Sequence, residues 1–125
     1  MSAPRTAPMI KTLAMPADTN TAGDIFGGWV LSQMDIAGGI TAADHANCRV
    51  VTVGIEAMSF LKPVRVGDIL SVYTEIAHTG KTSIGVRLEA WVQRQHSGDS
   101  HKVTEGVFTF VALDEGGKKR QVAAR

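Results

Sequence analysis

The chain has 125 residues, a formal net charge of +1, and a composition of 44% hydrophobic and 20% charged residues. This length suits one domain with one core, and the composition is not that of a disordered chain. A net charge so close to zero gives no electrostatic reason to expect a nucleic acid or a membrane as a partner. The single cysteine, Cys48, excludes an intrachain disulfide and argues against a cysteine-based metal site. We therefore expect a single-domain protein of a reducing, cytoplasmic compartment.

The N-terminal third begins with a tail and a short strand. Residues 1–8 contain two prolines and little to bury, so we expect a flexible tail, and the same holds for residues 116–125. A short strand is predicted within Met9–Met15, where Pro16 stops it. A loop rich in Asp, Thr, Asn and Gly follows and ends at Asp24.

The pattern then predicts a long helix from about Gly27 to Ala46, with Asp24 as a candidate N-cap. Four glycines and the carboxylate of Asp35 make this segment too polar to span a membrane. The helix is apolar almost all round, so one sheet alone would leave much of it exposed. A second subunit is expected to cover the rest.

Period-two patterns replace the helical pattern after Asn47. Four strands are predicted, each bounded by turn residues: Arg49–Met58, Ile69–His78, Thr82–Arg94 and Lys102–Leu113. The first of them should place Val51, Val53, Ile55 and Ala57 on one face. One early helix followed by strands in short connections indicates an α+β fold, an antiparallel sheet wrapped around the helix. Trp91 falls on the polar face of its strand, where we expect it to pack against another subunit.

The segment Asn20–Asp35, NTAGDIFGGWVLSQMD, carries the strongest chemical signal. Asp35 is the only charged residue between Ile25 and Ala43, and a buried, unpaired carboxylate is costly. Gly27 and Gly28 allow close backbone approach, and free N–H groups at a helix start attract developing negative charge. An oxyanion site and an acid/base carboxylate fit an acyl-transfer centre. From the residues alone, a structural role for Asp35 is equally plausible.

Three runs resemble the YciA-like acyl-CoA thioesterases, which have the hotdog fold: LAMPADTNTAGDIFGGWVLSQMD, RVVTVGIEAMSFLKPVRVGD and TSIGVRLEAWV. The resemblance extends from about Lys11 to Val111. It implies hydrolysis of acyl-CoA thioesters without a metal or organic cofactor, since coenzyme A is part of the substrate and the product. It also implies a dimer whose sheets join edge to edge, commonly assembled into a hexamer as a trimer of dimers, with the active sites at the dimer interface.

The same resemblance assigns roles to residues. It makes Asp35 the general base or the nucleophile, and it places Asn20 of the opposite subunit beside it as an orienting group. Apart from the resemblance, the position of Gly28 at the helix start favours its N–H as the oxyanion donor, with Gly27 next to the substrate.

Coenzyme A also carries phosphates, so basic residues near the sheet edge are candidate contacts. These candidates are Arg49, Lys62 and Lys81, with Ser59 and Thr82 as additional hydrogen-bonding groups. For each basic residue taken alone, an ordinary solvated surface charge is the simpler interpretation.

Two other functions remain open at this point. A non-catalytic acyl-CoA binding module would share the fold but would release no thiol. A hotdog hydratase or dehydratase normally needs a histidine and a carboxylate, and the loop-helix segment Asn20–Asp35 contains no histidine. The four histidines of the chain show no metal-ligand spacing.

Overall fold

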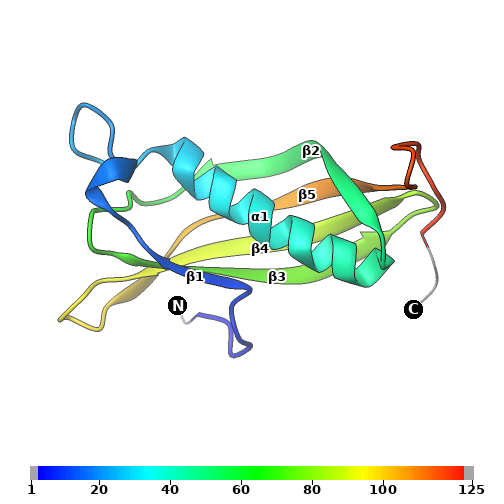
Figure 1. The fold of residues 1–125 in the computed structure, drawn as a ribbon. Helices are drawn as coiled ribbons and strands as arrows, with labels where there is room; N and C mark the ends of the chain where they lie inside the picture. Colours follow the sequence, from blue (N-terminus) through cyan, green and yellow to red (C-terminus); the bar gives the residue numbers. More distant parts are fainter. Residues whose placement is uncertain (1–2, 123–125) are drawn as a thin grey trace.

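In the computed structural model, which describes residues 3–122, one long helix lies across one face of a five-stranded antiparallel sheet (Figure 1). The strand order is β1-β3-β4-β5-β2, so β1 and β2 form the two edges. The predicted α+β fold is confirmed. The elements are β1 Ile10–Leu13, the 3-10 helix η1 Pro16–Asp18, α1 Gly27–Ala46, β2 Arg49–Phe60, β3 Ile69–Thr79, β4 Ser83–Gln93 and β5 Ser100–Leu113.

Helix α1 has the predicted bounds, but its N-cap is different. The residue at the cap is Phe26, which makes no side-chain hydrogen bond to the helix, so the assignment of Asp24 as the cap was wrong. Asp24 instead belongs to the preceding loop. At the other end, Asn47 closes the helix in the left-handed conformation, at φ 54°, which Asn tolerates better than most residues. Among the described residues, no helix is long and apolar enough to cross a membrane.

The core lies between one side of α1 and the central strands. From the helix, Met34, Ala37 and Gly38 are buried there, and Phe108 and Phe110 of β5 are buried beneath them. A Cβ on Gly38 would lie 3.0 Å from the ring of Phe110. The glycine therefore allows the helix to approach the sheet closely.

The edge strand β2 departs from simple alternation. Its register against β5 shifts between Thr52 and Gly54, so Thr52 pairs with Phe110 and Ile55 pairs with Phe108. Because both phenylalanines belong to the core, Thr52 and Ile55 lie on the same face of the sheet. The expectation that Val51 and Ile55 share a face was wrong, because a β-bulge at Val53 inverts the alternation.

Trp91 is buried within the single chain, at 2% exposure, so the expectation that it packs against another subunit was wrong. The register between β4 and β5 shifts at Trp91, which also changes the alternation. Its indole N–H donates to Glu89, and the ammonium group of Lys102 lies 5.9 Å from the ring centroid. Neighbouring side chains of the same sheet therefore cover this tryptophan.

Residues 116–122, expected to be part of a flexible tail, are attached to the body of the chain. Lys119 forms an isolated bridge with Leu113 at the end of β5. Val122 N–H donates to the carbonyl of Lys81 in the β3–β4 turn. This segment therefore lies at the same end of the molecule as the C-terminal end of α1.

Candidate active site

Asp35 is exposed in the single chain, contrary to the burial expected from its apolar surroundings. Its neighbours Met34 and Ala37 take the buried side of the helix, which turns Asp35 away from the core. One carboxylate oxygen, Oδ1, accepts a hydrogen bond of 2.6 Å from the hydroxyl of Thr52 on β2. The carboxylate is thus held at one oxygen, while Oδ2 remains available for another contact.

The surface around Asp35 is apolar and includes the free edge of the sheet. Ile36 and Ile40, on the same side of α1, are 49% and 48% exposed. Strand β2 is paired only with β5 within the described chain, so its other edge presents unpaired backbone groups. Ile55 of this strand, which lies on the same face of the sheet as Thr52, is exposed as well. Such an edge and such a patch are typical of a surface that another chain covers.

The helix start offers two free backbone donors. Trp29 N–H and Val30 N–H both donate to the carbonyl of Phe26, at 3.1 and 3.4 Å. Gly27 and Gly28 are therefore the helical residues whose N–H groups lack a partner within the described chain. A Cβ on Gly28 would meet nothing within 4 Å. The single chain therefore gives no packing reason for glycine at this position.

A cavity of about 300 Å³ lies beside this helix start. Gly27 and Lys62 line it, so two of the candidate residues meet here. Its remaining wall is apolar and was not anticipated as a site: Ile25, Val30, Phe60, Leu61, Pro63, Val64 and Val103. The Phe60 ring lies 3.5 Å from where a Cβ of Gly27 would be. The apolar FL pair directly before Lys62 was the available sequence signal for this wall.

Asn20 organises the loop before the helix. Its side-chain oxygen accepts hydrogen bonds from Ala22 N–H at 2.9 Å and Asp24 N–H at 3.1 Å. This is the local bonding expected of an Asx residue in a turn. The loop is closed by a bridge between Thr19 and Ile25. The side-chain NH₂ group of Asn20 is then the polar group left to donate to another molecule.

Gly28 and Asp35 lie on the same helix, seven residues apart, which corresponds to about 10 Å along the helix axis. An oxyanion donor must lie about 3 Å from the oxygen it stabilises, and a base must lie at a similar distance from the attacking group.

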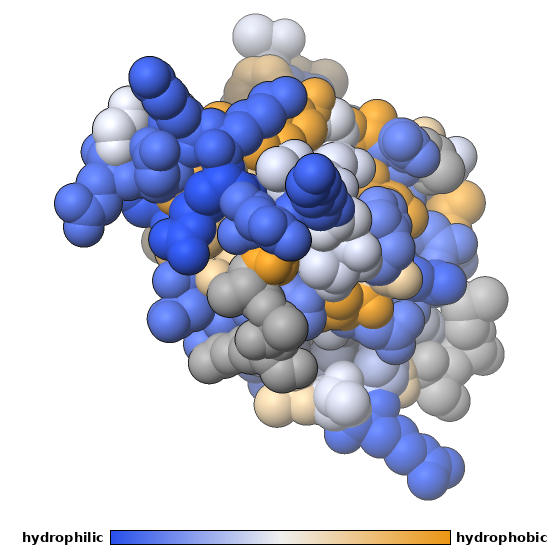
Figure 2. Space-filling model, turned by 90° about the vertical axis from the view of Figure 1, so that its right-hand side faces the viewer, coloured by the Kyte–Doolittle hydropathy of each residue, from blue (hydrophilic) through white to orange (hydrophobic). Residues whose placement is uncertain are grey.

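The candidate coenzyme A contacts fall into two groups. Ser59 and Lys62 lie near the helix start, whereas Arg49, Lys81 and Thr82 lie at the opposite end of the sheet. The 20-residue helix between these ends is about 30 Å long. Figure 2 views the molecule from the second end, which is largely hydrophilic. The structure therefore does not bring all five candidates together in one chain.

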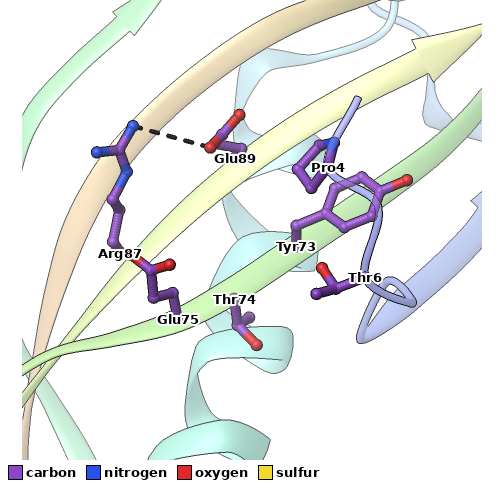
Figure 3. A pocket seen from close by; sticks show the side chains of 7 residues that line it. All are labelled: Pro4, Thr6, Tyr73, Thr74, Glu75, Arg87 and Glu89. Atoms are coloured by element: carbon purple, nitrogen blue, oxygen red, sulfur yellow. Dashed lines mark ion pairs between the residues drawn. The ribbon is translucent and has the colours of Figure 1, made fainter. Parts of the chain in front are cut away.

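The sheet face opposite α1 carries a charged network. Arg87 and Lys102 both form ion pairs with Glu89 and Glu105. The hydrogen bond from Lys102 is the main cause that lowers the pKa of Glu105. A hollow of about 320 Å³ next to Arg87 and Glu89 is lined mostly by polar side chains and by the N-terminal segment (Figure 3). None of the residues assigned above to catalysis or coenzyme A binding lines it.

His101, close to Lys62, has a lowered pKa. Burial lowers its pKa, and the positive charges of Arg94 and Lys62 lower it further. Its Nε2 atom is buried without a hydrogen-bond partner in the described chain. Across residues 3–122, no three His, Cys, Asp or Glu side chains are grouped closely enough to hold a metal ion.

Comparisons with known proteins identify the family of this chain. The thioesterase superfamily model matches residues 22–98. Acyl-CoA thioester hydrolase YciA of Salmonella typhimurium is 51% identical over 115 residues, which cover 90% of this chain and 86% of that protein. A hexameric hotdog fold thioesterase of Campylobacter jejuni is 42% identical with a TM-score of 0.90, covering 94% of this chain and 91% of that one.

A more distant relative has been solved with ligands. It is an acyl-CoA hydrolase from Staphylococcus aureus in complex with butyryl coenzyme A, coenzyme A and coenzyme A disulfide. It is 31% identical, with a TM-score of 0.84, and the match covers 92% of this chain and 70% of that one. The family model, the sequence relatives and the solved structures thus agree. The chain belongs to the thioesterase superfamily and has the hotdog fold.

Proposed function

We propose that this protein hydrolyses acyl-CoA thioesters to a free acid and coenzyme A. The observation that carries the proposal is the position of Asp35: a carboxylate with one free oxygen, on an exposed apolar side of α1. Family membership supports this chemistry, and so do the names of the relatives, which are acyl-CoA thioester hydrolases. When a second chain covers such a surface, bulk water is excluded from it. A carboxylate there can serve as a base or as a nucleophile.

The proposed reaction uses donors and acceptors from two chains. The thioester carbonyl accepts a hydrogen bond from Gly28 N–H, which stabilises the oxyanion as it forms. Asp35 of the other subunit takes a proton from water as the water attacks the carbonyl carbon. The C–S bond then breaks, and the proton passes to the coenzyme A sulfur. In the alternative route Asp35 attacks the carbon itself, the C–S bond breaks and coenzyme A leaves as the thiolate, which takes up a proton. Water then cleaves the resulting anhydride to the free acid and regenerates the Asp35 carboxylate. Asn20, through its free NH₂ group, orients the reacting groups.

The residue spacing supports the assignment of Asn20 and Asp35. The Staphylococcus aureus hydrolase has been solved with an asparagine replaced by alanine and with an aspartate replaced by alanine. Those two positions are 15 residues apart in that chain. Asn20 and Asp35 are separated by the same interval in this chain. We infer that the two pairs correspond.

The assembly that we propose brings Gly28 of one chain close to Asp35 of another. We propose that two β2 edges pair about a twofold axis, so that the two sheets become continuous and the two α1 helices lie side by side and antiparallel. If the axis passes near residues 31 and 32, Gly28 of one chain lies level with Asp35 of its partner, because both are equally far from the axis. Three such dimers would form a hexamer like that of the Campylobacter jejuni relative.

The proposed mechanism needs no metal and no organic cofactor, because water, carboxylate and backbone N–H groups supply every step. Coenzyme A enters as part of the substrate. A cytoplasmic location remains part of the proposal, supported by the single cysteine and by the expected supply of acyl-CoA there.

Thiol release from a panel of acyl-CoA esters of increasing chain length tests this function. We expect stoichiometric release of free thiol and acid, with activity unchanged after treatment with EDTA. Binding without thiol release would favour a non-catalytic acyl-CoA binding module. Hydration of an enoyl-CoA without thiol release would favour the hydratase. Loss of activity with EDTA and its return with zinc would contradict the metal-free mechanism.

A further inference from the structure

One face of the sheet buries an aromatic residue that the helix does not cover. Trp91 lies on the face opposite α1, because it pairs with Lys102 of the charged network on that face. Its exposed fraction is 2%, although the outer face of an antiparallel sheet is commonly in contact with water. Glu89 and Lys102 contact Trp91 from within the sheet. The segment before β1 adds cover from outside the sheet.

This segment, residues 3–8, turns from the sheet edge onto the outer face. Met9 N–H donates to the carbonyl of Val72 at 2.8 Å, so the chain is still attached to β3 at this point. Before it, the backbone bends at residues 5–6. A hollow of about 260 Å³ has Ala3 and Pro8 in its wall, together with Tyr73 and Trp91. The segment therefore lies against the aromatic part of the outer face.

The same segment also lines the hollow of about 320 Å³ beside Arg87 and Glu89 (Figure 3). Pro4 and Thr6 lie there next to the ring of Tyr73. Because Tyr73 lines both hollows, the two are neighbouring parts of one outer groove, which the segment follows from residue 8 to residue 4.

Both prolines of the segment meet an aromatic ring in the outer groove. Pro4 shares its hollow with Tyr73, and Pro8 shares its hollow with Tyr73 and Trp91. Aromatic-lined grooves bind extended proline-containing segments, because proline is restricted before binding and loses little conformational freedom. Proline also has no backbone N–H that would need a partner on an apolar surface. The residue types of the segment and of the groove therefore match.

We propose that the outer face of β3 and β4 is a binding groove for an extended proline-containing peptide, and that residues 3–8 of the same chain occupy it as a strap. The dimer proposed above uses the β2 edge and the exposed side of α1, so it leaves this groove free. An uncovered surface of Tyr73 and Trp91 would favour association with other molecules. The strap covers that surface, and its attachment to β1 gives it a high effective concentration at the groove.

Cross-linking in the full-length protein identifies the occupant. In a Cys48→Ser background, Thr6→Cys and Glu75→Cys place one thiol on the strap and one on the groove, since both residues line the same hollow. A short bis-maleimide should join them within one chain. The protein should then still run as a single chain on a denaturing gel and gain the mass of one bridge. Thr6→Cys combined with Glu115→Cys, which lines neither hollow, is the control and should form no bridge.

Two results of this experiment would overturn the proposal. A bridge between two chains would show that the segment of a neighbouring copy fills the groove. No bridge at all, although each thiol reacts with a single maleimide, would show that the segment does not occupy the groove.

Thiol reactivity tests whether the prolines hold the strap in place. Ser71 lines the hollow that contains Pro8, so Ser71→Cys in the Cys48→Ser background reports how often the strap opens. Replacing Pro4 and Pro8 together with glycine should raise the rate of modification about tenfold, because glycine lacks the ring and gains freedom in the open state.

Arg5→Gly combined with Ala7→Gly is the matched control. It adds the same number of glycines to the strap, at two residues that line neither hollow. We expect the rate to change less than about twofold, because no contact with the aromatic rings is lost. A rate that is unchanged when both prolines are replaced would overturn the proposal. An increase in this control as large as that in the proline variant would assign the effect to backbone flexibility alone and would also overturn it.

Discussion

The two sides of α1 have different tasks, although both are apolar. The side that faces the sheet carries small and medium residues such as Ala37 and Gly38, and it is fully buried within one chain. The opposite side carries Asp35, Ile36 and Ile40, all of them exposed in the single chain. Residues on the first side pack within the chain, and we propose that residues on the second side serve assembly and hydrolysis. The overall hydrophobicity of a helix does not distinguish these two tasks.

The two glycine pairs of the helix show the same contrast. Gly38 lies against the ring of Phe110, where a side chain would not fit without displacement. Gly28 has open space around it in the single chain, so packing within the chain gives no reason for it. The proposed mechanism gives it a reason, because the substrate carbonyl would approach the backbone N–H of Gly28 closely. Identical residues can thus reflect packing at one position and chemistry at another.

The largest effect is expected from Asp35→Asn, on the exposed side. The change keeps the volume and removes the charge, so thiol release should fall roughly 100-fold or more, the scale of losing a base or nucleophile. The melting temperature should remain close to that of the wild type, because the side chain is exposed. Asp24→Asn, in the exposed loop before the helix, is the control and should retain activity. An active Asp35→Asn protein would remove Asp35 from the mechanism.

Ile40→Lys tests whether the exposed side of α1 is needed for assembly. A charge placed at this exposed apolar position should prevent a second chain from covering it, since burying an unpaired ammonium group costs several kcal/mol. Light scattering should then show a folded monomer that has lost most of its activity. Val66→Lys changes a similarly exposed residue, on the β2–β3 loop, and should assemble normally. An Ile40→Lys protein that assembles normally would place the interface elsewhere.

A smaller effect is expected on the buried side, where Gly38→Ala and Gly39→Ala form a matched pair. Alanine gains about 1 kcal/mol of helix propensity at either position. At Gly38 the new methyl would lie 3.0 Å from the buried Phe110 ring, whereas at Gly39 the nearest contact is 3.8 Å. Overpacking costs about 1–3 kcal/mol, so Gly38→Ala should be less stable than Gly39→Ala by about that amount. Urea unfolding measures the difference, and equal stabilities would contradict the packing role of Gly38.

The fold could be predicted from the sequence because short stretches of residues indicate the helix, the strands and the turns. The spacing of apolar residues predicted the helix and the strands, and turn residues such as Gly67 and Gly80 predicted the turns. The irregular points were not predictable in this way. The bulges after Thr52 and at Trp91 change which face a side chain occupies, and they depend on pairing with β5. An alternating pattern contains no information about where that pairing slips.

The active-site candidates were predictable only in part, for a related reason. Asp35 and the glycine pair stood out because a lone charge and two glycines are unusual in an apolar helix. The partner of Asp35 within the chain, Thr52, did not stand out, because threonine is ordinary in a strand. The apolar wall of the cavity had only a weak signal, the Phe60-Leu61 pair before Lys62, because its other members, such as Val103, are distant in sequence and meet only in the folded chain.

Activity in mixed assemblies of Asp35→Asn and Asn20→Ala chains tests most directly the claim that one site uses both chains. Each variant alone should be nearly inactive. If Asp35 and Asn20 come from opposite subunits, a mixed dimer has one doubly altered site and one intact site. Refolding the two variants together in equal amounts should then restore roughly a quarter of the wild-type activity, since half of the dimers are mixed and half of their sites are intact. If no activity returns although mixed dimers form, both residues act within one chain, and the shared site is contradicted.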